Sequence, residues 1–145
     1  MGVIMKIEDV LPHREPFLFV DEIIGHKYME FAKGVKKIQD SELWTKGHFP
    51  GNPVFPGVLL LEIMAQVGGF IFADENGKML DNKFAYLSKV DQLKFKKKVV
   101  PGDIVEVEAS FIDSFINYSR ISAKSFVNRK IVAEAEITYT FMVRM

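Results

Sequence analysis

The stretch that decides the fold runs from residue 48 to residue 72 and reads HFPGNPVFPGVLLLEIMAQVGGFIF. Its first ten residues, 48–57, hold three prolines and two glycines, which oppose regular structure yet leave the backbone little freedom, so we predict a stiff loop. From residue 58 to about residue 72 the residues favour helix and are apolar almost all round, as expected of a helix enclosed on every side. The sequence therefore predicts a helix in the middle of the fold.

Strand-like segments lie on both sides of this helix. Before it, residues 17–24 follow an ordered turn that contains prolines, and residues 28–38 form a second strand in which Gly34 marks a candidate bulge. After it, four segments follow at residues 84–95, 104–113, 116–127 and 131–143. Because lone strands must pack to stay soluble, we predict a single α+β domain over residues 1–145, with one antiparallel sheet wrapped around the apolar helix.

The composition excludes several kinds of site. The 145 residues include no cysteine, which rules out disulfides, thiolate nucleophiles and cysteine metal ligands, and which makes the reducing cytosol the simpler expectation. The formal net charge is zero, so no overall basic field points to nucleic acid. No export signal is evident at residues 1–11, and the longest apolar stretch is interrupted by Glu62 and Gln66, so we expect no membrane span.

His48 stands at the mouth of the stiff loop that leads into the helix. A histidine titrates near neutral pH and can take or give a proton, provided that its position is fixed. The neighbouring prolines would supply that rigidity. The alternative is a loop histidine that only hydrogen-bonds to the backbone, and the residues alone leave both interpretations open.

Glu62 is a carboxylate within an otherwise apolar helical run. Burial without a partner would be costly and would raise its pKa, which suits a group that must donate a proton near neutral pH. Gln66, one turn later, would lie on the same face and could orient the carboxyl group. Alternatively, this edge of the helix reaches solvent and Glu62 is simply hydrated.

Gly57 begins the predicted helix, where backbone N–H groups lack partners within the helix. Such an N–H could bind a carbonyl oxygen and stabilise negative charge that develops on it; an ordinary first turn is the alternative. The chain contains no phosphate-binding glycine motif, so we expect neither a nucleotide cofactor nor a metal.

The remaining charged groups are assigned less specific roles. His13 and Arg14, between two prolines, are interpreted as structural, and His26 as a solvated turn residue. Lysines between positions 94 and 98 could form a positive patch for an acidic partner, and a solvated strand face would explain them equally well. Other basic residues that could extend this patch are Arg120, Lys124, Arg129 and Lys130.

Three separated sets of residues resemble the FabZ family of (3R)-hydroxyacyl-[acyl carrier protein] dehydratases. They are LPHR with PFLFVD at residues 11–14 and 16–21, HFPGNPVFPGV with LEIMAQ at 48–58 and 61–66, and FK with VVPGD at 95–96 and 99–103. The resemblance covers nearly the whole chain in the expected order. It implies a hotdog fold, which is a curved antiparallel sheet around a central helix. It also implies a homodimer whose sites each take a histidine from one subunit and a glutamate from the other, with trimers of such dimers, homohexamers, common.

The resemblance further implies the chemistry. His48 would remove a C2 proton, and Glu62 would protonate the departing C3 hydroxyl, giving a trans-2-enoyl thioester on acyl carrier protein. The N–H of Gly57 would bind the thioester carbonyl, and the carbonyl of Val54 would hold the second ring nitrogen of His48. The residues expected to bind substrate are Gly57, Val54 and Gln66. The residues expected to dock the acidic carrier are Lys96, Lys97, Arg120 and Lys124.

Some departures from the family pattern leave room for other activities. Lys98 stands where many members have proline, and Lys89 where a small residue is usual. One alternative is a dehydratase that also isomerises trans-2 to cis-3 enoyl chains. Alternatives of another class are a hotdog thioesterase, against which the spacing from His48 to Glu62 argues, and a noncatalytic hotdog subunit, which would have little reason to keep both residues.

Overall fold

One long helix and a six-stranded antiparallel sheet form the core of the computed structural model, which describes residues 6–144. The strands are β1 (Glu22–Lys27), β2 (Phe31–Lys37), β3 (Lys83–Phe95), β4 (Ile104–Ser114), β5 (Tyr118–Val127) and β6 (Lys130–Val143), and the helices are α1 (Ile7–Val10), η1 (Leu43–Lys46), α2 (Gly57–Gly69), η2 (Phe70–Phe72) and η3 (Leu80–Asn82). The strands pair in the order β1-β2-β4-β5-β6-β3. This arrangement confirms the predicted α+β hotdog fold.

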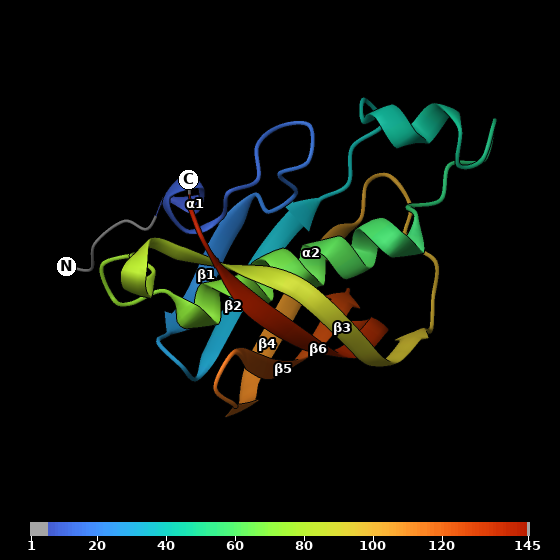
Figure 1. Ribbon diagram of the computed structural model, residues 1–145. Helices are drawn as coiled ribbons and strands as arrows, with labels where there is room; N and C mark the ends of the chain where they lie inside the picture. Colours follow the sequence, from blue (N-terminus) through green and yellow to red (C-terminus); the bar gives the residue numbers. More distant parts are fainter. Residues whose placement is uncertain (1–5, 145) are drawn as a thin grey trace.

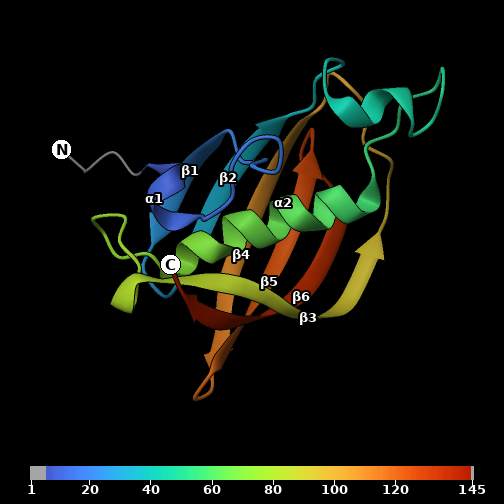
Figure 2. The same cartoon turned by 45° about the horizontal axis from the view of Figure 1, so that its top comes forward.

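The helix α2 lies on the concave side of the curved sheet (Figures 1 and 2). Ile63, Met64 and Val67 of this helix are fully buried, and burial of such side chains stabilises the fold by roughly 2 kcal/mol each. The predicted central helix is confirmed, with its last residues in the tighter η2 turn. Buried and exposed positions alternate along β4, because Val105, Val107 and Ala109 are buried between exposed neighbours.

Two glycines let the sheet and the helix approach closely. A Cβ atom at Gly34 would lie 2.8 Å from Cγ2 of Val67, and one at Gly68 would overlap the hydroxyl of Tyr139, so any side chain there would push the two layers apart. The bulge predicted at Gly34 is wrong. β2 pairs with β4 in regular register through Gly34, and the irregularity lies in the neighbouring strand β1, between Ile23 and Gly25.

The strand predicted over residues 17–24 is wrong in its first part, since β1 begins only at Glu22. The backbone of residues 17–19 forms hydrogen bonds with a side chain and not with a neighbouring strand. The N–H of Phe19 donates to Oε1 of Gln66 at 3.0 Å, and Nε2 of Gln66 donates to the carbonyl of Phe17 at 2.9 Å. Because Gln66 is almost fully buried, its amide satisfies backbone groups that a neighbouring strand would otherwise satisfy.

The strand β3 forms one edge of the sheet and runs beside α2 along the near margin of Figure 2. It carries the large exposed side chains of Tyr86, Leu93 and Phe95. An open edge strand leaves a row of backbone N–H and C=O groups without strand partners. An edge with these apolar side chains is typical of a surface that pairs with another chain.

Candidate active site

His48 is held from two sides by main-chain groups. The backbone N–H of His48 donates to the carbonyl of Trp44 at 3.0 Å, and the ring nitrogen Nδ1 lies 2.8 Å from the carbonyl oxygen of Val54. The N–H of Val54 donates back to the carbonyl of His48 at 2.8 Å, which closes the loop around the ring. A carbonyl oxygen accepts only from a protonated nitrogen, so Nδ1 carries a hydrogen, and in the neutral ring Nε2 then keeps its lone pair. The ring of His48 is therefore fixed in position by the backbone of the loop.

A half-buried polar cluster supports the segment just before His48. The carboxylate of Glu42 accepts the N–H of Gln39 at 2.6 Å and the indole N–H of Trp44 at 3.2 Å. The ammonium group of Lys36, which is buried, lies 3.2 Å from the same carboxylate. Because Trp44 also supplies the carbonyl that holds the His48 backbone, the ion pair fixes the approach to the loop.

Gly57 begins α2, as predicted, and its N–H has no hydrogen-bond partner among residues 6–144. The aromatic ring of Phe95 lies over it, since a Cβ atom at Gly57 would come within 3.0 Å of that ring. His48, Gly57 and Phe95 line one cavity of about 360 Å³, together with residues 96–98. An acceptor oxygen in this cavity could reach the free N–H at the positive end of the helix.

Glu62 projects from the middle of α2 into a second cavity, of about 390 Å³. Burial raises the pKa of its carboxyl group, and the hydrogen bond that Nε2 of Gln66 donates to its Oε2 at 2.9 Å opposes that rise. The raised pKa favours the protonated form, as a proton donor requires. The predicted partnership of Glu62 with Gln66 is confirmed by this contact.

The structure brings a histidine to Glu62 that sequence reasoning had assigned a structural role. Nε2 of His13 lies 3.4 Å from Oε2 of Glu62, and both side chains line the same cavity. Burial, and next the nearby charge of Arg14, lower the pKa of His13. The proline-flanked turn around His13 was the available signal, but its distance from Glu62 along the chain hid the contact.

His48 and Glu62 face separate cavities within one chain. The two cavities share no lining residue, although both border β3, at residues 84–87 beside Glu62 and at Phe95 beside His48. The single chain thus places His48 and Glu62 in two cavities at different positions along its open edge strand.

The four basic residues predicted to dock a carrier lie in two places. Lys96 and Lys97 line the His48 cavity, and Nζ of Lys96 also lies 3.3 Å from a carboxylate oxygen of Glu134. Arg120 and Lys124 lie on β5, away from that cavity. Arg120 is bound by both oxygens of Asp113, at 2.9 and 2.8 Å, so its charge is largely balanced.

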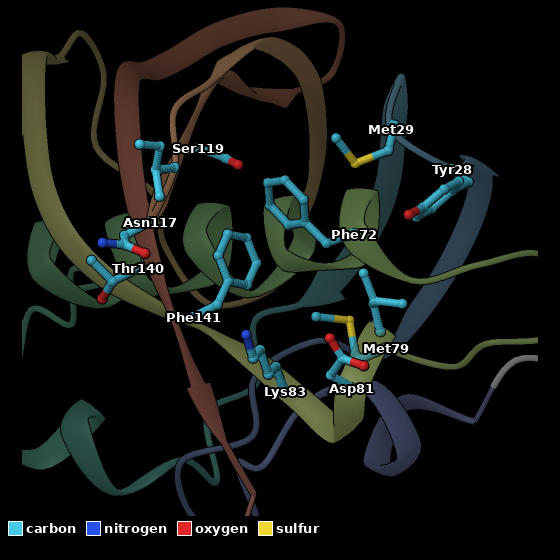
Figure 3. A pocket seen from close by; sticks show the side chains of 12 residues that line it. Tyr28, Met29, Phe72, Met79, Asp81, Lys83, Asn117, Ser119, Thr140 and Phe141 are labelled. Atoms are coloured by element: carbon cyan, nitrogen blue, oxygen red, sulfur yellow. The ribbon is translucent and has the colours of Figure 1, made fainter.

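A further cavity, of about 370 Å³, contains none of the predicted site residues. Figure 3 shows the rings of Phe72 and Phe141 next to each other in it, in an edge-to-face arrangement, with Met79 and Lys83 nearby. Within the described part of the chain, no group of three His, Cys, Asp or Glu side chains is placed to hold a metal ion. No helix among these residues is long and apolar enough to cross a membrane.

Comparison with known proteins extends this picture. The family model of the FabA-like domain matches residues 11–136. A 3-hydroxyacyl-[acyl-carrier-protein] dehydratase FabZ from Geobacter metallireducens is 40% identical over 95% of this chain and 92% of its own length. The protein of the same name from Actinobacillus pleuropneumoniae serotype 5b is 38% identical over 92% of this chain and 87% of its own length.

Solved structures agree on the fold. The dehydratase heterocomplex ApeI:P from Xenorhabdus doucetiae contains a chain that superposes with a TM-score of 0.72 at 11% identity, covering 94% of this chain and 91% of the other. The PaaI protein of E. coli superposes with a TM-score of 0.64 at 16% identity, covering 82% and 81%. At such low identity these similarities bear on the architecture alone.

Proposed function

This chain belongs to the FabA-like family and is a 3-hydroxyacyl-[acyl-carrier-protein] dehydratase of the FabZ type, and on that premise we propose that His48 and Glu62 carry out the reaction. Nε2 of His48 takes the C2 proton of the 3-hydroxyacyl thioester, and Glu62 donates a proton to the C3 hydroxyl. The C2–H and C3–O bonds break, the C2=C3 double bond forms, and water leaves. The relatives favour neither the isomerase nor the thioesterase alternative.

The observation that carries this proposal is the division of the two groups between cavities at opposite ends of β3. An antiparallel pair of β3 strands across a two-fold axis would place residues 84–87 of one copy beside Phe95 of the other. The Glu62 cavity of one subunit would then adjoin the His48 cavity of its partner. The open, partly apolar edge of β3 supports such pairing.

The substrate-binding roles follow from the same cavities. The free N–H of Gly57 would bind the thioester oxygen and stabilise the negative charge that forms there as C2 loses its proton. The carbonyl of Val54 keeps the His48 ring in its basic tautomer, and Gln66 holds the carboxyl group of Glu62. The thioester itself delocalises the carbanion-like charge that forms at C2. The proposed steps therefore need only the substrate and the residues of this chain.

The wider setting is proposed on the same premise. Residues 1–145 act as a single hotdog domain in a homodimer, with three dimers forming a homohexamer, in the cytosol. The acyl chain arrives on an acyl carrier protein, which the names of the relatives state for those proteins, and we expect this carrier to be acidic. Lys96 and Lys97 beside the His48 cavity are the docking residues nearest to the chemistry, with Arg120 and Lys124 contributing at longer range.

Complementation between inactive chains tests the shared site. His48→Ala and Glu62→Ala should each lower dehydration of a 3-hydroxyacyl carrier protein by orders of magnitude while the fold survives, as checked by thermal melting. Mixing the two variants under conditions of subunit exchange should restore activity, because some interfaces then hold both intact groups. A mixture of two His48→Ala preparations is the control. No recovery after proven exchange would rule out the shared site.

A single-turnover experiment tests the reaction itself. Mass spectrometry of the carrier protein should record the loss of one water from the 3-hydroxyacyl chain. Release of the acyl group would instead identify a thioesterase, and an unchanged substrate would identify a noncatalytic subunit. Size-exclusion chromatography with light scattering distinguishes a homohexamer from a homodimer.

A further inference from the structure

Among residues 6–144, hydrogen-bond and ion-pair contacts to the carboxyl group of Glu62 involve only one of its two oxygens. Nε2 of Gln66 donates to Oε2 at 2.9 Å, and Nε2 of His13 lies 3.4 Å from the same atom. Oε1 forms no hydrogen bond with any side chain or backbone group in residues 6–144. The two oxygens of the proposed acid are therefore in different environments.

The His13 ring is held in place by its surroundings. The guanidinium group of Arg14 donates to the carbonyls of Leu11 at 2.8 Å, of His13 at 2.6 Å and of Glu8 at 3.2 Å, which fixes the turn. Nδ1 of His13 is buried and has no hydrogen-bond partner in the described part of the chain. The ring thus points Nε2 at Glu62, and the hydrogen bonds from Arg14 hold the backbone of this turn in place.

Burial acts on both groups of this contact. Burial lowers the pKa of His13 and raises the pKa of Glu62, so neither group favours its charged form. The other titratable groups that face this cavity are Tyr86 from β3 and Tyr139 from β6. The hydroxyl of Tyr139 already donates to the carbonyl of Ala65 at 2.6 Å. A neutral imidazole with its hydrogen on Nε2 then suits Oε2 as an acceptor, and Nδ1 is left as an unprotonated ring nitrogen.

We propose that His13 is a positioning residue for the acid, occupying Oε2 of Glu62 together with Gln66 so that Oε1 carries and delivers the proton. This rests on the proposed role of Glu62. The distance of 3.4 Å is longer than an ordinary N–H···O hydrogen bond, and contacts of this kind tighten when substrate binds. A proton kept on Oε1 lies on the side of the carboxyl group that has no protein partner, where the substrate hydroxyl would arrive.

Three substitutions separate this role from a purely structural one. His13→Leu removes the N–H donor at similar size, His13→Gln keeps a neutral N–H donor, and His13→Lys places a fixed cation beside Glu62. With carrier-bound substrate, His13→Leu should lower kcat about tenfold, the effect of one lost hydrogen bond, with KM little changed. His13→Gln should recover most of that loss. His26→Leu is the matched control, because Nε2 of His26 is also buried with no hydrogen-bond partner among residues 6–144, and His26 lines neither the Glu62 cavity nor the His48 cavity.

A second readout does not depend on turnover. Titration of the Glu62 carboxyl by 13C NMR in the resting, full-length enzyme, assigned with Glu62→Gln, reports its pKa directly. The pKa of Glu62 should rise in His13→Leu, which loses a donor to the carboxylate, and should fall in His13→Lys, where the cation stabilises the carboxylate. In His13→Gln it should stay near that of the wild type.

The kinetic and titration results can each overturn the proposal. A wild-type kcat in His13→Leu, or a Glu62 titration that is identical in the Leu and Lys variants, would overturn the proposal. If His13→Leu fails to fold, the other two variants still decide it, because the pKa of Glu62 should stay near the wild-type value in His13→Gln and fall in His13→Lys, and equal values in these two variants would overturn the proposal. Retained turnover in Glu62→Gln would instead show that Glu62 is not the acid, which is a failure of the proposed function. The titration of the Glu62 carboxyl distinguishes this result from a failure of the His13 contact.

Discussion

Nδ1 of His48 lies 2.8 Å from the carbonyl oxygen of Val54, so the backbone of the stiff loop selects the tautomer of the proposed base. We expect 15N NMR of the resting enzyme at neutral pH to show His48 with its hydrogen on Nδ1, assigned by comparison with His48→Gln. This tautomer leaves Nε2 free to take the C2 proton. A ring that is protonated mainly on Nε2 would contradict the assignment of Nε2 as the base.

Gln66 joins α2 to the segment before β1. Gln66→Leu keeps the size of the side chain but leaves the N–H of Phe19 and the carbonyl of Phe17 without their partner. A buried backbone group without a partner costs about 1–3 kcal/mol, so we expect a lower free energy of unfolding and a loss of activity together. Urea denaturation measures the first quantity, and an unchanged midpoint would show that the segment finds other partners.

Glu62 should make stability depend on pH. Because burial raises the pKa of its carboxyl group, the folded protein binds this proton more tightly than the unfolded chain does. The stabilising contribution is thus complete below the ordinary value of 4.5 and is lost as the pH rises through the raised folded pKa. Glu62→Gln should therefore have nearly the Tm of the wild type at pH 4 and a higher Tm than the wild type at pH 8. The opposite trend in calorimetry would contradict the raised pKa.

Neighbouring glycines of α2 offer a matched pair. A methyl group at Gly68 would overlap Tyr139 and Ile121, whereas one at Gly69 would lie 3.6 Å from Leu11, an ordinary contact. Gly68→Ala should lower the free energy of unfolding by about 1–3 kcal/mol, and Gly69→Ala should leave it unchanged or raise it. Equal effects in chemical denaturation would mean that the layers are looser than the structure indicates.

Charge reversal tests carrier docking. Lys96→Glu and Lys97→Glu should each raise KM for carrier-bound substrate about fivefold at low salt, with kcat nearly unchanged, because an exposed charge pair is worth up to about 1 kcal/mol. Arg120→Glu and Lys124→Glu should have smaller effects, since Arg120 is already bound by Asp113 and both lie on β5. KM for a short substrate analogue without the carrier should stay the same in every variant.

The control for docking is Lys27→Glu on β1, which lies outside the His48 cavity. Steady-state kinetics at several salt concentrations should show that the effect of Lys97→Glu fades as salt rises, because exposed charges are screened within about 10 Å at 0.1 M. If both lysine reversals leave KM unchanged at low salt, the carrier docks elsewhere.

The sequence by itself determined the loop, the central helix and most of the sheet. These follow from local patterns, namely prolines that limit the backbone at residues 48–57, an apolar run that favours helix, and alternation along β4. The four strands after the helix begin and end within two residues of the predicted limits. His48, Glu62 and Gln66 were also singled out from the sequence as candidate site residues, because of their neighbourhood in the stiff loop and the apolar helix.

Only the tertiary structure decided which groups meet. The side chain of Gln66 takes the place of a strand partner for Phe17 and Phe19, and His13 reaches Glu62 across almost fifty positions of sequence. Asp113 balances Arg120 through the turn between β4 and β5. Such contacts depend on how distant segments pack, and hydrophobic periodicity records only which face of each segment is buried, not which polar group lies opposite it.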